Sequence, residues 1–399
     1  MAMSVQIERQ ARIGMSGNEA VAYAVKQSNV DVVAAYPITP QTIIVERIAE
    51  YVNNGELDAA YIAVESEHSA LSSCIGASLA GARVFTATAS QGLALMWEVL
   101  WIASAMRTPI VMALANRALS APINIHCSHD DAYAVRDAGW IQLFAENVQE
   151  AYDLTIQAFK IAEDERVLLP TIVNLDGFIL SHSVESLYVL NDESVRAFLP
   201  SRKLVNPINI RNPMTYGPLV LYDYYMEFKR AQAEAFNNSY PTILNILREY
   251  SRLSGRNYEP IKTYGMEDAE AALVILGSSA GTARFVARKL RGEGKKVGVV
   301  SLTLYRPFPR DELAKVLRNV KSVVVMDRSY SFGSPGAPLL MDVASALYDE
   351  KERPLLINAV YGLGGRDFTA DQAETAFCIA LETTRSGEVK ERQIWLGVR

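Results

Sequence analysis

The amino-acid sequence predicts an α/β fold built on parallel sheets. Short apolar runs rich in β-branched residues alternate with longer segments of helical periodicity. The short runs carry apolar side chains at successive positions, and the alternation resumes in a second block near Ala271. Strands that are apolar on both faces and separated by helices are typical of parallel sheets covered on both sides. With 399 residues, of which 50% are hydrophobic, the chain can bury the cores of two or three domains.

The first block alternates expected strands and helices in chain order. Its expected strands are Val30–Ala35, Ala60–Val64, Val84–Thr88, Pro109–Leu114 and Leu169–Leu175. Its expected helices are Glu19–Gln27, Gln41–Val52, Ser69–Ala80, Gly92–Ala105 and Val148–Ile161. The most apolar stretch, Leu93–Met106, is interrupted by Glu98, so we expect it to form a buried helix rather than a membrane span.

The second block has the same organisation. Its expected strands are Ala272–Leu276, Val297–Ser301, Ser322–Met326 and Leu355–Val360, with helices that include Gly281–Arg291 and Pro309–Val316. Between the blocks, residues 201–224 contain Pro207, Pro213 and Pro218, which is typical of an irregular connection. Met226–Ser254 follows as one long, charged amphipathic helix. We therefore expect an α/β domain at 1–240, a helical linker at 241–267 and a second α/β domain at 268–399.

Composition excludes several classes of function. The net charge of −6 comes from interspersed acidic and basic residues, so the basic surface of a nucleic-acid-binding protein is not expected. The first twenty residues lack the apolar core of a secretory signal, and no run is long enough to span a membrane. Cys74, Cys127 and Cys378 are far apart, so this chain is not expected to bind zinc or an iron–sulfur cluster by itself. A cytoplasmic protein without its own metal site is predicted.

The first candidate site is the sequence YPITP, Tyr36 to Pro40, directly after an expected strand. Two prolines stiffen this turn, and ligands bind at the carboxyl ends of the strands in open α/β sheets. Thr39 could therefore present a hydroxyl group to a ligand. The alternative is that Thr39 caps the helix that begins near Gln41.

The second candidate site is the pair Glu65 and Glu67, where an expected strand gives way to a helix rich in Ala, Ser and Gly. A carboxylate at a helix N-terminus is often only a favourable partner of the helix dipole. The catalytic interpretation instead places a glutamate in an apolar wall, where it can hydrogen-bond a cofactor ring. The small residues of the helix would allow a flat ring or a second subunit to approach closely.

The third candidate is Arg117, at the carboxyl end of another expected strand. If the strands are parallel, Arg117 and Thr39 lie at the same edge of the sheet. An arginine in this place can form a paired hydrogen bond with a substrate carboxylate. The alternative is a structural ion pair within the chain.

These segments, taken together and in order, resemble the alpha subunit of 2-oxoacid:ferredoxin oxidoreductases. The similarity covers essentially the whole chain. Its segments are GNEAVAYAV, YPITP, VESEHSA, FTATASQGLALMWE, PIVMALANRAL, RDAGWIQLFAENVQEAYD, LDGFILSH, DYYMEFKRAQAEA, RPFP, DRSYSFGSPGAPL and GLGGRD. The resemblance implies a thiamine-diphosphate-binding domain of the pyrimidine type, followed by an α/β domain like the C-terminal domain of transketolase.

The resemblance also implies roles for individual residues. Thr39 matches a residue that contacts the substrate, and Arg117 matches the partner of the substrate carboxylate. Glu67, rather than Glu65, matches the acid that activates the cofactor, and Pro37 and Ile38 are expected as further cofactor contacts. The segment INIHCSHDD departs from the family pattern, which leaves His126, Cys127 and His129 without assigned roles; His129 is expected to be a loop histidine with satisfied hydrogen bonds.

The sequence lacks the G-D-G motif that usually binds the Mg²⁺ and diphosphate of this cofactor. The nearest fragment, Asp176–Gly177, follows a leucine. The resemblance therefore implies that a beta subunit holds the diphosphate, the Mg²⁺ and a [4Fe-4S] cluster. Gamma and delta subunits would carry further clusters toward ferredoxin. In the second block, the segment GSSAGTAR at 277–284 could bind an anion at a helix N-terminus, but we expect it to be a scaffold or interface feature.

The expected reaction is the reversible oxidative decarboxylation of pyruvate with coenzyme A, which yields acetyl-CoA, CO₂ and reduced ferredoxin. The unaltered YPITP sequence favours pyruvate. Three other substrates remain as alternatives: 2-oxoglutarate, a branched 2-oxoacid or oxalate. A non-catalytic scaffold subunit is the alternative from a different class of function. A stand-alone transketolase fits less well because the diphosphate motif is missing.

Overall fold

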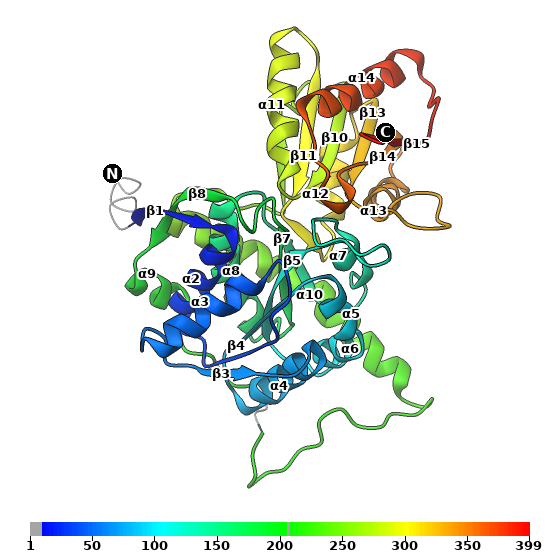
Figure 1. Ribbon diagram of the computed structural model, residues 1–399. Helices are drawn as coiled ribbons and strands as arrows, with labels where there is room; N and C mark the ends of the chain where they lie inside the picture. The colour runs from blue at the N-terminus through cyan, green and yellow to red at the C-terminus, as the bar shows by residue number, and fades with distance from the viewer. Residues whose placement is uncertain (1–9, 206–207) are drawn as a thin grey trace.

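Two mainly parallel sheets, one above the other in Figure 1, form the body of the protein. The structure is a computed structural model that describes residues 10–205 and 208–399. Residues 1–9, which belong to the expected first domain, and Pro207 of the expected connection lie outside the described residues. The layered arrangement of helices on parallel sheets confirms the predicted α/β class.

The lower sheet has seven strands in the order β12-β6-β7-β5-β4-β2-β3. Its strands are β2 (Val32–Ala35), β3 (Ala60–Ala63), β4 (Val84–Thr88), β5 (Ile110–Asn116), β6 (Ile141–Phe144), β7 (Thr171–Asp176) and β12 (Leu304–Arg306). All pairings are parallel except that of β12 with β6. The five strands expected in this block all form; β6, which contains the buried polar Gln142, was not predicted.

Helices cover both faces of the lower sheet. One face carries α2 (Gly17–Gln27), α3 (Thr42–Asn53) and α8 (Val148–Glu163), and the other carries α4 (Glu67–Ala80), α5 (Ser90–Leu95) and α6 (Trp97–Ala105). The single buried helix expected over this last region is wrong in two respects. It is divided at Met96, and its outer side leaves Leu95, Trp97 and Ile102 between 41% and 51% exposed.

The upper sheet has six strands in the order β15-β14-β13-β10-β11-β9. They are β9 (Ile261–Tyr264), β10 (Ala271–Leu276), β11 (Val297–Leu302), β13 (Ser322–Asp327), β14 (Leu355–Val360) and β15 (Gln393–Trp395). Helices α11 (Ser279–Gly292) and α14 (Ala370–Ser386) contact each other, as do α12 (Arg310–Leu317) and α13 (Pro338–Leu347). Strand β9 lies in the region expected as a helical linker. These residues form a strand instead because they pair antiparallel with β11 at the edge of the sheet.

Smaller elements complete the described chain. They are β1 (Gln10–Ser16), which pairs antiparallel with β8 (Val184–Leu190), α7 (Asp130–Ala134), α9 (Asp192–Phe198) and the single turn η1 (Leu363–Gly365). Within the described residues, no helix is both long enough and apolar enough to cross a membrane.

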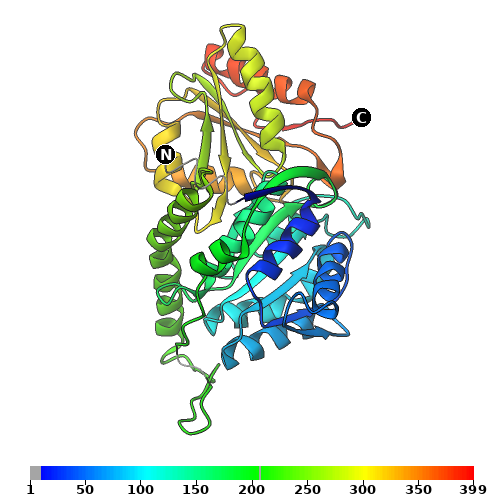
Figure 2. The ribbon, with the colours of Figure 1, turned by 90° about the vertical axis from the view of Figure 1, so that its left-hand side faces the viewer.

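The long helix α10 (Tyr225–Ser254) runs along the side of the lower sheet toward the upper one (Figure 2). The segment before α10, residues 208–224, extends away from the body of the protein in both views. This segment exposes large apolar side chains, including Ile210 at 92%, Leu219 at 89% and Tyr222 at 96%. Side chains of this kind are usually covered by another molecule when they cluster.

Strand β12 ties the two sheets together. It follows β11 of the upper sheet in the chain, yet Leu304 pairs with Leu143 of β6 in the lower one. One hydrophobic cluster includes residues of both sheets, among them Phe144 of β6 in the lower sheet and Val300 of β11 in the upper one. The two blocks are therefore packed on each other through shared backbone and core contacts.

Candidate active site at the carboxyl edge of the lower sheet

Three of the residues singled out in the sequence lie at one edge of the lower sheet. Strands β2, β3, β4 and β5 are parallel, so their carboxyl ends meet at this edge. Thr39 follows β2, Glu67 follows β3, and Arg117 follows β5. The expectation that Thr39 and Arg117 share an edge is confirmed.

Arg117 contacts the YPITP turn directly. Its Nη1 donates a hydrogen bond to the backbone carbonyl of Thr39 at 3.0 Å, and its Nε donates to the carbonyl of Asn124 at 3.0 Å. Two further side chains fix the turn: Gln41 donates to the carbonyl of Tyr36, and the buried Asn18 donates to the carbonyl of Pro40. The guanidinium and the turn are thus held as one unit.

The Thr39 side chain does not cap α3. That helix begins at Thr42, its N-cap residue is Gln41, and no side-chain cap is formed. Thr39 is exposed at the sheet edge, where its hydroxyl can meet a ligand. Pro37 is also exposed, and Ile38 is half-buried.

Arg117 carries a nearly buried charge that no described carboxylate neutralises. Its exposed fraction is 7%, and no carboxylate in the described ranges 10–205 and 208–399 forms an ion pair with its guanidinium. A buried charge is costly unless it is paired. The structural ion pair that the sequence left open is therefore not formed here, and an anionic ligand would satisfy the arginine.

Glu67 and Glu65 differ sharply in environment. Glu67 is the first residue of α4 and is 6% exposed, and the helix is capped by Ser66, which accepts from the backbone N–H of Ser69 at 3.2 Å. Glu65 is exposed. Its carboxylate accepts a hydrogen bond from the hydroxyl of Ser69, which lowers the pKa of Glu65 below its usual value.

The Glu67 carboxyl lies in a tight cradle beside Gly92 and Thr88. Both the carboxyl and the Thr88 hydroxyl in this cradle can form further hydrogen bonds. A Cβ atom at Gly92 would come within 2.6 Å of Glu67 Oε1 and 2.4 Å of Thr88 Oγ1, so only glycine fits beside it. The Thr88 hydroxyl is buried without a hydrogen-bond partner in the described part of the chain. No described residue donates a hydrogen bond to the Glu67 carboxyl, which leaves it available to a polar ligand atom.

Gly92 was not singled out in the sequence. It lies in the first turn of α5, which begins at Ser90 just after β4 ends at Thr88, and glycine is the usual residue where another group approaches the backbone closely. No described contact joins Glu67 to Arg117 or Thr39, so the site has two separate parts on one edge.

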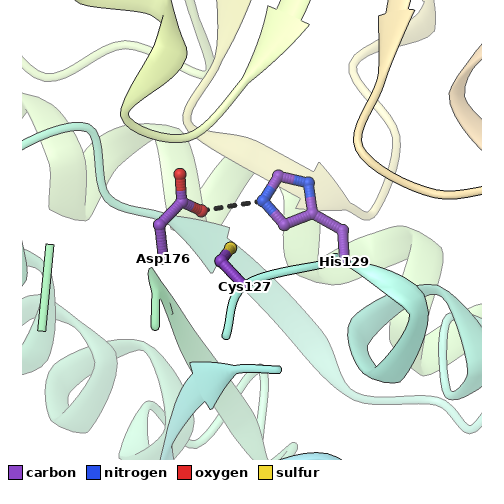
Figure 3. Close-up of side chains that lie close together, drawn as sticks. All are labelled: Cys127, His129 and Asp176. Carbon is purple, nitrogen blue, oxygen red and sulfur yellow. Dashed lines mark hydrogen bonds and ion pairs between the residues drawn. The ribbon is translucent and has the colours of Figure 1, made fainter. Parts of the chain in front are cut away.

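A second polar cluster lies at the carboxyl end of β7 on this same edge, where the lower sheet meets the upper block. Figure 3 shows the side chains of Cys127, His129 and Asp176, of which His129 Nε2 and Asp176 Oδ1 are 2.7 Å apart. All three are buried. His126 lies elsewhere: its ring stacks near Phe178, with centroids 4.7 Å apart.

Asp176 links this cluster to the upper sheet. It accepts hydrogen bonds from the backbone N–H of Ser278 at 3.1 Å and from its hydroxyl at 2.5 Å. Arg328 Nη1 lies 3.4 Å from its second oxygen. Although burial opposes ionisation, Arg328 and His129 hold the pKa of Asp176 well below its usual range.

The segment at 277–284 therefore does bind an anion, but the anion is Asp176 of the lower sheet. A Cβ atom at Gly277 would come within 2.7 Å of Asp176 Oδ1, so the glycine permits the contact. This arrangement supports the interface interpretation of the segment. Because His129 and Asp176 already bond each other and Arg328 supplies the positive charge, the cluster is better suited to an ion-pair network than to a metal ion.

We expect Asp176→Asn to lower the free energy of unfolding by about 3 kcal/mol, because it leaves the buried Arg328 guanidinium without its counter-ion. Chemical unfolding of the purified chain measures the change. The control is Glu249→Gln, which removes a carboxylate that pairs with Lys160 on the surface at 45% exposure. A similar loss in both variants would contradict the role of Asp176 as a buried link.

Comparison with known families matches both blocks of the chain. A family model described as "Pyruvate flavodoxin/ferredoxin oxidoreductase, thiamine diP-bdg" matches residues 23–247. A second, described as "Pyruvate:ferredoxin oxidoreductase core domain II", matches residues 269–373.

Relatives over the full length carry related names. The chain is 51% identical to pyruvate synthase subunit PorA of Thermotoga maritima, over 97% of this chain and 98% of the relative. It is 47% identical to the subunit of the same name from Pyrococcus abyssi, over 97% of this chain and 98% of the relative. It is 44% identical to ketoisovalerate oxidoreductase subunit VorA of Pyrococcus abyssi, over 96% of both.

Solved structures share the fold. A 2-oxoglutarate:ferredoxin oxidoreductase from Magnetococcus marinus, with 2-oxoglutarate, coenzyme A and succinyl-CoA bound, matches with a TM-score of 0.69 and 20% identity. The match covers 94% of this chain and 65% of that one, so this chain corresponds to about two-thirds of that longer polypeptide. A split-gene transketolase matches with a TM-score of 0.56 and 15% identity, over 94% of this chain and 100% of that one.

Proposed function

This chain belongs to the pyruvate:ferredoxin oxidoreductase family, and from that premise we propose which part of the reaction its residues perform. The chain is a subunit of an oxidoreductase of the pyruvate synthase type. The reaction converts pyruvate and coenzyme A to acetyl-CoA and CO₂, and two electrons pass to ferredoxin. The share that we assign to this chain is the pyrimidine side of the thiamine diphosphate site and the binding of the pyruvate carboxylate.

The observation that carries this assignment is the unpaired charge of Arg117. Its guanidinium is nearly buried and bonds only backbone carbonyls among the described residues. Pyruvate brings the missing negative charge, and a carboxylate can take two hydrogen bonds from one guanidinium. Thr39 presents its hydroxyl at the same place, where it can hold an oxygen of the substrate and fix its orientation.

Glu67 is the residue that we assign to the cofactor. When bound, thiamine diphosphate supplies the carbon nucleophile and holds the electron pair released by decarboxylation. The Glu67 carboxyl has free hydrogen-bonding capacity in a cradle formed by Gly92, which fits a ring nitrogen of the aminopyrimidine. Its hydrogen bond would favour the ring tautomer that can accept a proton, and Pro37 and Ile38 would line the same side.

Other subunits supply the remaining parts. We assign the diphosphate, the Mg²⁺ and a [4Fe-4S] cluster to a beta subunit, and the path to ferredoxin to gamma and delta subunits. Two faces of this chain support contacts of this kind: the exposed apolar side of α5 and α6, and the apolar segment before α10. We retain the proposed division into a cofactor domain at 1–240, a linker at 241–267 and a second domain at 268–399.

We expect the isolated chain to give no heat of binding with thiamine diphosphate at concentrations that saturate the assembled complex. The physical reason is that most of the binding free energy of a diphosphate comes from its metal and charged contacts, which we assign to another subunit. Isothermal titration calorimetry of the two samples is the test. Tight binding by the isolated chain would contradict the shared site.

A further inference from the structure

Asp131 connects three segments at the edge of the lower sheet. It lies in the first turn of α7 and is 1% exposed. Its Oδ2 accepts hydrogen bonds from the backbone N–H groups of Arg117 at 2.9 Å and Ser90 at 3.1 Å. Its Oδ1 accepts from the side chain of Asn116 at 3.1 Å and from the backbone N–H of Ala132 at 2.8 Å.

This carboxylate is fully used by the protein itself. Two hydrogen bonds to each oxygen satisfy its ordinary capacity as an acceptor. Burial raises the pKa of Asp131, but all four of its partners are N–H donors, so the group accepts at both oxygens as a carboxylate. It has no direction left in which to contact a substrate, and its effect must pass through the groups that it holds.

Two of those groups belong to the site. The hydrogen bond to the N–H of Arg117 fixes the backbone of the residue whose side chain donates to the Thr39 carbonyl. The hydrogen bond from the N–H of Ser90 to Asp131 fixes the first residue of α5, which has a positive φ of 46°. The Ser90 hydroxyl in turn donates to the carbonyl of Ala118 at 2.6 Å, so Asp131 and Ser90 together hold the chain on both sides of Arg117.

We infer that Asp131 is a positioning residue that holds the backbone of Arg117 so that its guanidinium receives the carboxylate of pyruvate. The inference rests on the proposed function, which makes Arg117 the partner of that carboxylate. Small displacements of a binding group cost much affinity for a substrate, because the paired hydrogen bonds depend on alignment.

Asp131→Asn tests the inference in the assembled complex, because it keeps the shape of the side chain. The amide nitrogen cannot accept a hydrogen bond, so two of the four donors lose their partner. We expect kcat/KM for pyruvate to fall about tenfold, mainly through a higher KM. The matched control is Asp192→Asn, since Asp192 also lies in the first turn of a helix, α9, and accepts from the side chain of Gln27 at 2.8 Å; we expect a change smaller than about twofold there.

A double-mutant cycle with Arg117→Ala shows whether Asp131 acts through Arg117. We expect Asp131→Asn to change kcat/KM by less than about twofold when Arg117 is already absent. A full tenfold loss in that background would overturn the inference and leave the proposed role of Arg117 intact. If Arg117→Ala itself leaves the KM unchanged, the proposed function fails at that residue, whatever Asp131 does.

Asn116→Ala is the second variant if Asp131→Asn does not assemble. It removes one of the four hydrogen bonds to Asp131 and leaves the other three. We expect the KM for pyruvate to rise about two- to threefold, again only while Arg117 is present. An unchanged KM in this variant would overturn the inference.

Discussion

Glu67→Gln should leave the complex assembled and reduce pyruvate-dependent ferredoxin reduction by about 10²- to 10⁴-fold. The glutamine keeps the size of the side chain in the cradle beside Gly92 but cannot exchange a proton with the aminopyrimidine ring. The loss should appear in kcat, because the missing interaction serves the reaction rather than the binding of pyruvate. Steady-state assays of the reconstituted complex with coenzyme A and ferredoxin measure it.

Glu65→Gln is the matched control. It makes the same chemical change two residues away, at an exposed carboxylate whose only described side-chain partner is the Ser69 hydroxyl. We expect activity within about twofold of the unaltered complex, as is usual for exposed polar substitutions. If Glu65→Gln stops the reaction and Glu67→Gln does not, the assignment of the cofactor acid is wrong by two residues.

The strands that the sequence predicted most closely are the ones buried on both faces. Val84–Thr88 and Leu355–Val360 form strands with the predicted bounds, because short, mostly apolar runs that contain β-branched residues favour buried strands in an α/β protein. Strand β12 could not be predicted. Its three residues become a strand only by pairing with β6, about 160 positions earlier in the chain, and no local pattern records that partner.

The candidate site likewise has features that the sequence predicts and features that it does not. The shared edge of Thr39 and Arg117 follows from parallel strands, so the strand pattern of the sequence is enough to predict it. The hydrogen bond from Arg117 to the Thr39 carbonyl is not predictable in this way, because it depends on how two loops fold back. The choice between Glu67 and Glu65 turns on where α4 begins, and helix ends are the least predictable part of a helix.

Asp131 shows why positioning residues escape prediction from sequence alone. It lies in the segment INIHCSHDD, which departs from the family pattern, and it directly follows a second aspartate, Asp130. Only the folded chain shows that Asp131 accepts from both Arg117 and Ser90, whereas Asp130 accepts from Ser329 and from the backbone of Leu119. The difference arises from contacts between residues far apart in the chain.

Arg117→Ala should raise the KM for pyruvate about 100-fold with a much smaller change in kcat. Truncating one partner of a nearly buried charge pair costs about 2–5 kcal/mol, and each 1.4 kcal/mol corresponds to about a tenfold change in affinity. Arg117→Lys should give a smaller rise, since an ammonium group keeps the charge but cannot form the paired hydrogen bonds of a guanidinium. Initial-rate assays over a range of pyruvate concentrations separate KM from kcat.

The comparison with Arg107→Ala decides whether the substrate charge is the cause. Arg107 precedes the amino end of the same strand, β5, and its guanidinium also donates to backbone carbonyls, those of Val167 and Leu168. Removing it should lower stability without raising the KM, because it lies at the opposite edge of the sheet from the YPITP turn. Equal increases in KM for both variants would mean that Arg117 only supports the strand, and the pyruvate carboxylate would then have to be bound by another group.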